Sequence, residues 1–188
     1  MRHVISALVM NEPGVLATVA GLFAARGFNI DSLVVGRTEN PDLSRMTVVA
    51  GGDENTLEQI RKQLAKLVPV VRVRDFKETA YIERDLALVT VNVGPEQRSE
   101  VIEIVGLFRG NVVDVARGSL MIELAGTEEK LEAFVDLMKP YGIKELARTG
   151  IIAMPRGTQT AKEEAAETGE GKRKRSLSAP AAPSLPPS

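Results

Sequence analysis

Hydrophobic residues along the first 155 positions follow two alternating patterns, one typical of strands and the other of helices. Residues 3–10 form a near-continuous apolar run and predict a first strand. Pro13 and Gly14 then open a segment whose large apolar residues fall on one helical stripe. Gly27 follows that stripe and is expected to end the helix in a left-handed cap.

Four further elements complete this first half of the pattern. Residues 28–38 and 45–51 read as strands that are joined by a turn at residues 39–42. Asp53 is a suitable N-cap for a second amphipathic helix, and residues 69–76 read as the closing strand. The predicted order is therefore strand, helix, strand, strand, helix, strand.

The second half repeats this order, which indicates a duplication. Gly21-Leu22-Phe23 in the first helix recurs as Gly106-Leu107-Phe108 in the third. The predicted elements are a strand at 86–93, a helix from Pro95, a hairpin of 111–116 and 119–125, a helix through Leu131, Phe134, Val135 and Met138, and a last strand at 143–152.

These patterns predict an α+β protein of two ferredoxin-like βαββαβ units, spanning residues 1–77 and 78–155. Each unit should be an antiparallel four-stranded sheet with two helices on one face. The other face is apolar enough that another subunit or domain is expected to bury it. From residue 156 to 188 large apolar residues become scarce and proline is frequent, which predicts a disordered C-terminal tail.

Composition excludes several classes of protein. The 188 residues contain 24 Lys and Arg and 25 Asp and Glu, a net charge of −1 that argues against a dedicated nucleic-acid binder. The absence of cysteine excludes disulfides, Cys-ligated zinc and thiol nucleophiles. His3 is the single histidine and is expected to be a strand residue rather than a base or ligand. No apolar run is long enough to span a membrane or resembles a signal peptide, so a cytoplasmic, non-catalytic chain is expected.

The most informative segment lies between the first strand and the first helix. The first turn of a helix presents unpaired N–H groups and the positive end of the dipole, and Gly14 has no side chain to cover them. Asn11 carries an amide that can donate to a carboxylate and a carbonyl that can accept from an ammonium group. These residues fit the backbone of a free amino acid, although from the residues alone an ordinary helix start with a capping Asn is the favoured explanation.

The same residues resemble the signature of ACT domains, which are small regulatory modules that bind amino acids between two subunits. The resemblance rests on Asn11-x-Pro13-Gly14-x-Leu16 followed by Gly-Phe-Asn-Ile-Asp-Ser-Leu at 27–33. Further segments are similar to the regulatory (small) subunit of acetolactate synthase: 43–47, 57–64, 108–110, 113–115 and 147–150. The similarity spans about residues 1–154, and therefore includes both units.

This resemblance implies a non-catalytic regulatory subunit with no cofactor of its own. Its partner would be the large catalytic subunit, which uses thiamine diphosphate, Mg and FAD. In the family, residues 1–77 form the ACT domain and residues 78–155 serve assembly and contact with the catalytic subunit. Two ACT domains would pair in a homodimer and bind valine, or another branched-chain amino acid, between them. The effector would contact two segments from different chains: Asn11, Glu12, Pro13, Gly14, Val15 and Leu16 of one, and Asn29 and Ile30 of the other.

Other functions fit the residues less well. An ACT sensor that regulates a different amino-acid enzyme is the closest alternative. A DNA-binding regulator would need a helix-turn-helix, and no segment of 1–155 is left over to form one. In the second unit the equivalent loop, residues 92–96, reverses the Pro-Gly order and places Glu96 near the helix start, where it would repel a carboxylate. That unit is therefore expected to serve assembly, not effector binding.

Overall fold

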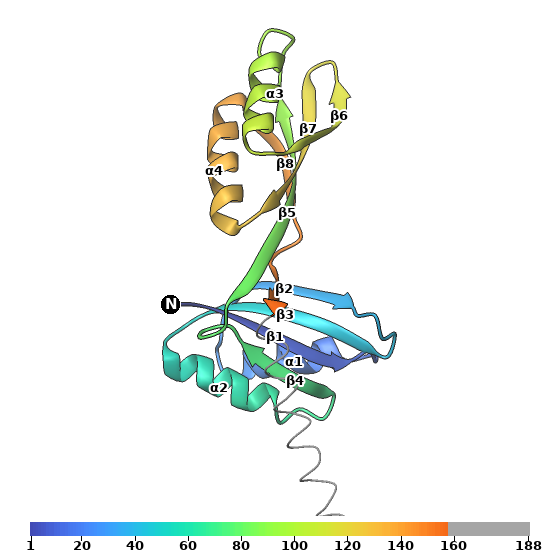
Figure 1. The fold of residues 1–188 in the computed structure, drawn as a ribbon, viewed down its shortest axis with the longest axis vertical. Coiled ribbons are helices and arrows are strands. Elements are labelled where there is room, and N and C mark those ends of the chain that lie inside the picture. Colours follow the sequence, from blue (N-terminus) through green and yellow to red (C-terminus); the bar gives the residue numbers. More distant parts are fainter. Residues whose placement is uncertain (158–188) are drawn as a thin grey trace, which may run out of the picture.

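The computed structural model describes residues 1–157, which form two βαββαβ units arranged along one long axis (Figure 1). The strands of the first sheet lie in the order β2-β3-β1-β4, and α1 and α2 cover one face. This arrangement confirms the predicted α+β fold. Its elements are β1 (Arg2–Met10), α1 (Val15–Ala25), β2 (Ile30–Arg37), β3 (Leu43–Gly51), α2 (Glu54–Leu64) and β4 (Val70–Asp75).

Alternation along β1 builds the core of this unit. Ile5, Ala7 and Val9 are fully buried and point to the same face, because successive strand residues point to opposite sides of a sheet. Phe23 of α1 and Ile60 of α2 pack against that face in the same core. The helical stripes that the sequence predicts are therefore the stripes that meet the sheet.

The second unit repeats the plan with the strand order β6-β7-β5-β8. Phe134 of its second helix is fully buried and meets the Phe108 ring edge-on, with 5.4 Å between ring centroids. The elements are β5 (Tyr81–Asn92), α3 (Arg98–Leu107), β6 (Asn111–Ala116), β7 (Ser119–Gly126), α4 (Glu128–Met138), a 3-10 turn (Lys139–Tyr141) and β8 (Ile143–Arg148).

Two expectations for this unit are wrong. The third helix begins at Arg98 and not at Pro95, because the Gln97 amide donates to the Gly94 carbonyl at 3.2 Å and closes a separate turn first. The strand predicted at 143–152 is divided into β8 and β9 (Ile152–Pro155). β9 pairs with the beginning of β5, at Tyr81–Arg84, and so leaves the second sheet.

The strand β9 returns to the first unit and covers part of the face that the helices leave open. Ile151 and Ala153 are buried there against Val4, Val49 and Phe76. The chain itself thus supplies some of the cover that was expected from another domain or subunit. Figure 1 shows β9 lying over this sheet where β5 leaves it.

The expected boundary at residues 77 and 78 falls in the connection between β4 and β5. The predicted tail, 156–188, lies from residue 158 onward outside the described residues. None of the helices formed by residues 1–157 is long and apolar enough to cross a membrane. Over the same range, no cluster of His, Cys, Asp or Glu side chains is placed to hold a metal ion.

Candidate effector site

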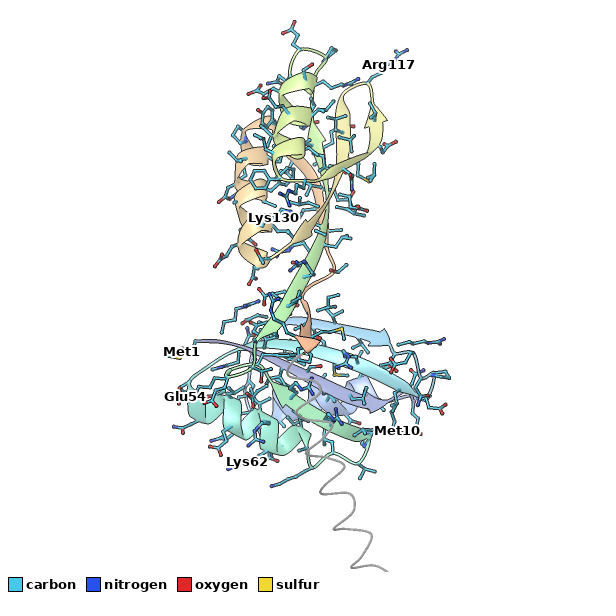
Figure 2. The ribbon with its side chains drawn as sticks, viewed as in Figure 1. Met1, Met10, Glu54, Lys62, Arg117 and Lys130 are labelled. Atoms are coloured by element: carbon cyan, nitrogen blue, oxygen red, sulfur yellow. The ribbon has the colours of Figure 1, made fainter. Side chains whose placement is uncertain are left out.

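The predicted effector loop follows β1 at one edge of the first unit. Figure 2 labels Met10, the last residue of β1, at the side of this unit that lies farthest from Met1. The chain continues through Asn11 to Gly14, and α1 begins at the next residue. An open pocket lies over this loop and is lined by Met10, Glu12, Pro13, Gly14, Val15, Thr18, Val68 and Pro69.

Asn11 anchors the loop to the turn between β2 and β3. Its backbone amide donates to the Asp42 carbonyl at 2.8 Å, and its side-chain Nδ2 donates to the Pro41 carbonyl at 2.9 Å. Its Oδ1 accepts from the Ser44 hydroxyl at 3.1 Å. The Nδ2 and the Oδ1 of the Asn11 side chain, which could both bind an amino acid, are therefore already engaged in holding the loop in place. Each can make one further hydrogen bond, since an amide has two N–H groups and two oxygen lone pairs.

Gly14 is the N-cap of α1 and adopts a left-handed conformation with φ 86° and ψ −12°. Its carbonyl accepts from the Thr18 amide at 2.9 Å and from the Thr18 hydroxyl at 3.0 Å. Within residues 1–157, no side chain caps the start of α1, and its first turn contains no acidic residue. The Val15 amide donates to the Glu12 carbonyl in a long contact of 3.5 Å, so the next N–H groups, of Leu16 and Ala17, are the ones most open to an anionic ligand.

The starts of α2 and α4 are built differently. Asp53, predicted as the N-cap of α2, accepts from the Thr56 amide at 2.7 Å. Hydrogen bonds from the Thr56 hydroxyl and amide lower the pKa of Asp53 below its ordinary value. Thr127 caps α4 by accepting from the Lys130 amide at 3.4 Å. A side-chain oxygen thus occupies the N-terminus of each of these helices, whereas a glycine precedes α1.

Asn29 and Ile30 lie just beyond the other end of α1. Gly27 ends the helix with φ 67°, as the sequence predicts. The Asn29 Nδ2 donates to Asp31 Oδ1 at 2.6 Å, and Ile30 is half-buried against the core. The 11 residues of α1 separate these residues from Gly14 by about 16 Å. One chain therefore does not bring the two predicted halves of the site together.

The outward face of α1 carries no charge. The helix, VLATVAGLFAA, has one polar residue, Thr18, and its exposed positions include Leu16 (47% exposed) and Gly21. The right-handed crossover from β1 to β2 passes over β3, so α1 lies next to the edge strand β2. Val35 on β2 is also 43% exposed. A helix that is apolar on every side is typical of a buried position, and in the single chain the outward face of α1 is exposed.

Three supporting residues were not among the site residues predicted from the sequence. Thr18 and Ser44 hydrogen-bond within the loop, and Asp31 holds the Asn29 side chain. Asp31 has a local signal, because short polar side chains two positions apart often bond in a turn. Ser44 has none, since its contact joins residues 33 positions apart.

The loop of the second unit differs from the effector loop, as expected, but for a partly different reason. Glu96 lies in the turn before α3, not in its first helical turn. The acidic residue in that first turn is Glu100. A carboxylate still lies near the positive end of the helix, and this unit has no glycine at the N-cap position.

Two family models match the chain, one for each unit. The AHAS small subunit-like ACT domain matches residues 5–72. The model described as the small subunit of acetolactate synthase matches residues 84–157. Both units, and not the first alone, therefore have counterparts in this family.

Individual relatives agree with these models. A probable acetolactate synthase small subunit of Archaeoglobus fulgidus is 54% identical over 159 residues, which are 85% of this chain and 99% of that protein. The acetolactate synthase small subunit of Mycolicibacterium smegmatis is 49% identical over 155 residues, covering 82% of this chain and 91% of its own. The crystal structure of the small subunit from Thermotoga maritima is similar with a TM-score of 0.77 and 45% identity, over 83% of this chain and 98% of that one.

Proposed function

From the premise that this chain belongs to the family of acetolactate synthase small subunits, we propose that it binds valine, or another branched-chain amino acid, between the ACT domains of two copies. In this proposal the chain activates the catalytic subunit and transmits feedback inhibition to it in the cytoplasm. Small subunits of this enzyme are regulatory, and catalysis and its cofactors belong to the large subunit. The partner of this chain is accordingly an acetolactate synthase large subunit.

The observation that carries this proposal is the separation of the two predicted halves of the site along α1. Gly14 stands at the start of the helix, and Asn29 follows its end, about 16 Å away. A two-fold axis beside α1 and perpendicular to it would place a second helix antiparallel to the first. The start of each helix would then lie next to the end of the other. Two complete sites would form. Each would combine the loop before α1 of one copy with the segment after α1 of the other.

The chemistry of such a site suits an amino acid with an apolar side chain. The N–H groups at the start of α1 would bind the carboxylate, favoured by the helix dipole. The remaining amide capacity of Asn11 and Asn29 would serve the polar end of the ligand. Ile30 and Val35 would offer apolar surface to a branched side chain.

The uncharged face of α1 supports a homodimer through the same edge. Leu16 and Gly21 on α1 and Val35 on β2 are exposed in the single chain. Small residues on α1 would let two helices approach closely, and the edge strand β2 has unpaired backbone groups to offer. Pairing of this edge would complete both the apolar cover of α1 and the effector site.

The direct test reconstitutes the enzyme from purified subunits. The chain alone is expected to form no acetolactate from pyruvate, because catalysis in this family belongs to the large subunit. Added to a matching large subunit, it should increase the rate, and valine should then reduce that rate. The large subunit alone with valine is the control. Turnover by this chain alone, or a rate that neither the chain nor valine changes, would contradict the proposal.

A further inference from the structure

Two segments of the described chain connect the units, and they run side by side. One is β5, which begins on the first unit and continues into the second sheet (Figure 1). The other is the short stretch 149–151 between β8 and β9. Outside this junction the units also meet at a half-exposed ion pair, in which Arg2 Nε of β1 lies 3.1 Å from Glu128 Oε2 of α4. The junction is the route that includes the buried groups and the covalent connections.

The junction contains an irregularity in strand pairing. The β5–β8 ladder ends at the pair Ala87 and Arg148, and the β5–β9 ladder starts at the pair Arg84 and Ile152. Two residues on β5 therefore face three on the returning strand, which is the arrangement of a β-bulge. The middle residue of the three, Gly150, has φ 83°. The returning strand changes here from one sheet to the other.

Each backbone amide of the bulge has a specific acceptor. The Thr149 amide donates to the Leu86 carbonyl at 3.0 Å. The Gly150 amide donates to Asp85 Oδ1 at 3.1 Å, and the Ile151 amide donates to Ser32 Oγ at 3.2 Å. Ser32 belongs to β2 of the first unit, so the bulge is held from both sides.

Asp85 is the centre of this junction and is only 2% exposed. Its Oδ2 accepts from Arg148 Nε at 2.8 Å and from Arg148 Nη2 at 2.5 Å, and its Oδ1 also accepts from the Thr149 hydroxyl at 3.2 Å. Arg148 forms a second ion pair with Glu132 of α4. Partial burial by itself lowers the pKa of Arg148, but the hydrogen bonds that it donates to Asp85 and Glu132 raise the pKa overall. The carboxylate thus ties the bulge to a helix of the second unit.

Ser32 connects the same bulge to the predicted effector segment. It follows Asp31, which accepts from the Asn29 side chain and lies where the pairing of β2 with β3 shifts register. A Cβ atom on Gly150 would lie 2.5 Å from Ser32 Oγ and 3.0 Å from a Val34 methyl. The bulge therefore packs directly on the beginning of β2, and a movement of this segment cannot leave Gly150 undisturbed.

We propose that Ser32 and Asp85 are positioning residues that couple effector binding at Asn29 and Ile30 to the second unit through the bulge at 149–151. The inference rests on the proposed function, because it needs an effector at the ACT interface. A ligand that reorders the start of β2 changes the acceptor of the Ile151 amide. The Gly150 amide, Asp85 and Arg148 then carry that change to α4.

The test uses the reconstituted holoenzyme with Ser32→Ala and Asp85→Asn, and Ser119→Ala and Asp75→Asn as matched controls on other strands. Two quantities are measured: the Kd of valine for the small subunit by calorimetry, and the residual activity of the holoenzyme at saturating valine. Ser32→Ala should keep the Kd within about threefold and raise the residual activity about fivefold, since couplings of this size are typical between sites. Asp85→Asn should act in the same direction, and both controls should match the parent.

The outcomes separate this inference from the proposed function. Parental residual activity in Ser32→Ala, with valine still bound, would overturn the coupling role and leave the effector site standing. A large loss of valine affinity in the isolated Ser32→Ala subunit would also overturn it, because Ser32 would then belong to the effector site. A parent chain that neither binds valine nor responds to it would overturn the proposed function itself. Ser32→Ala removes only one half-buried hydroxyl and should therefore remain folded. It tests the proposal even if Asp85→Asn, which changes a buried ion pair, fails to fold.

Discussion

Gly14→Asp should abolish inhibition by valine while activation of the catalytic subunit persists. The variant places a fixed carboxylate at the N-terminus of α1, where the carboxylate of the effector is proposed to bind. The Asp carboxylate would accept from the N–H groups that the ligand needs, and its charge would repel the ligand's carboxylate. Each charge-assisted hydrogen bond is worth about 1.5–3 kcal/mol, so the loss of two should weaken binding about a hundredfold or more.

The variant should remain folded. A Cβ on Gly14 would meet no atom within 4 Å, so the cost comes from the backbone and not from packing. The left-handed conformation, with φ 86°, costs about 1–2 kcal/mol for most residues, and Asp tolerates it better than most. This cost is small beside a typical domain stability of about 5–15 kcal/mol. An acidic residue at a helix N-terminus is locally favourable, and the positive φ offsets part of that advantage here.

Gly14→Asn is the matched control, because it has the same shape and backbone tolerance without the charge. It should reduce valine affinity much less than Gly14→Asp does. Calorimetry gives both affinities, and holoenzyme assays give activation and inhibition. If valine binds Gly14→Asp within about threefold of the parent Kd, the effector does not bind at this helix N-terminus.

Local chemistry explains why most of the first unit could be predicted. Asp53 precedes a charged helix by one residue, and such a cap needs only its own neighbour Thr56. Gly27 follows an apolar stripe and adopts the left-handed conformation that ends helices. Residues 3–10 form a near-continuous apolar run, which is typical of a strand that is buried on both faces, as β1 is. In each case the deciding interaction lies within a few residues.

The returning strand could not be predicted for the opposite reason. Residues 143–152 carry a continuous strand pattern, and the break depends on Asp85, which lies 63 residues before Arg148. No local period encodes that contact. Gly150 signals an irregularity, but whether a glycine marks a turn, a bulge or a close approach depends on what packs against it. Here Ser32, 118 positions earlier in the sequence, packs against it.

The candidate site was predictable only in parts. The motif that begins at Asn11 identified the loop, but its hydrogen bonds to Pro41 and Ser44 depend on how the β2–β3 turn folds back. The polar side-chain atoms of Asn11 hydrogen-bond within the protein even without a ligand. The distance between Gly14 and Asn29 follows from α1 once its length is known. A second copy of the chain then becomes a geometric requirement of the proposed site.

That requirement makes the dimer testable at Gly21 on the outward face of α1. Gly21 is exposed, and a Cβ there would meet no atom within 4 Å in the single chain. Glu is a better helix former than Gly by roughly 0.5–1 kcal/mol, so Gly21→Glu should not destabilise the isolated fold. In a symmetric dimer along α1, however, each copy would bring one carboxylate into the apolar contact.

Gly21→Glu should therefore convert the dimer into monomers and remove valine inhibition together with it. Like charges brought together at an interface cost several kcal/mol, so the dimer Kd should rise by about a hundredfold or more. Gly106→Glu is the matched control, since Gly106 is an exposed glycine on α3 at which a Cβ would also meet no atom within 4 Å. Sedimentation across a concentration series measures the Kd, and thermal unfolding checks the fold. A Gly21→Glu protein that stays dimeric at the parental Kd would show that α1 is not the dimer contact, and that the effector site does not form along it.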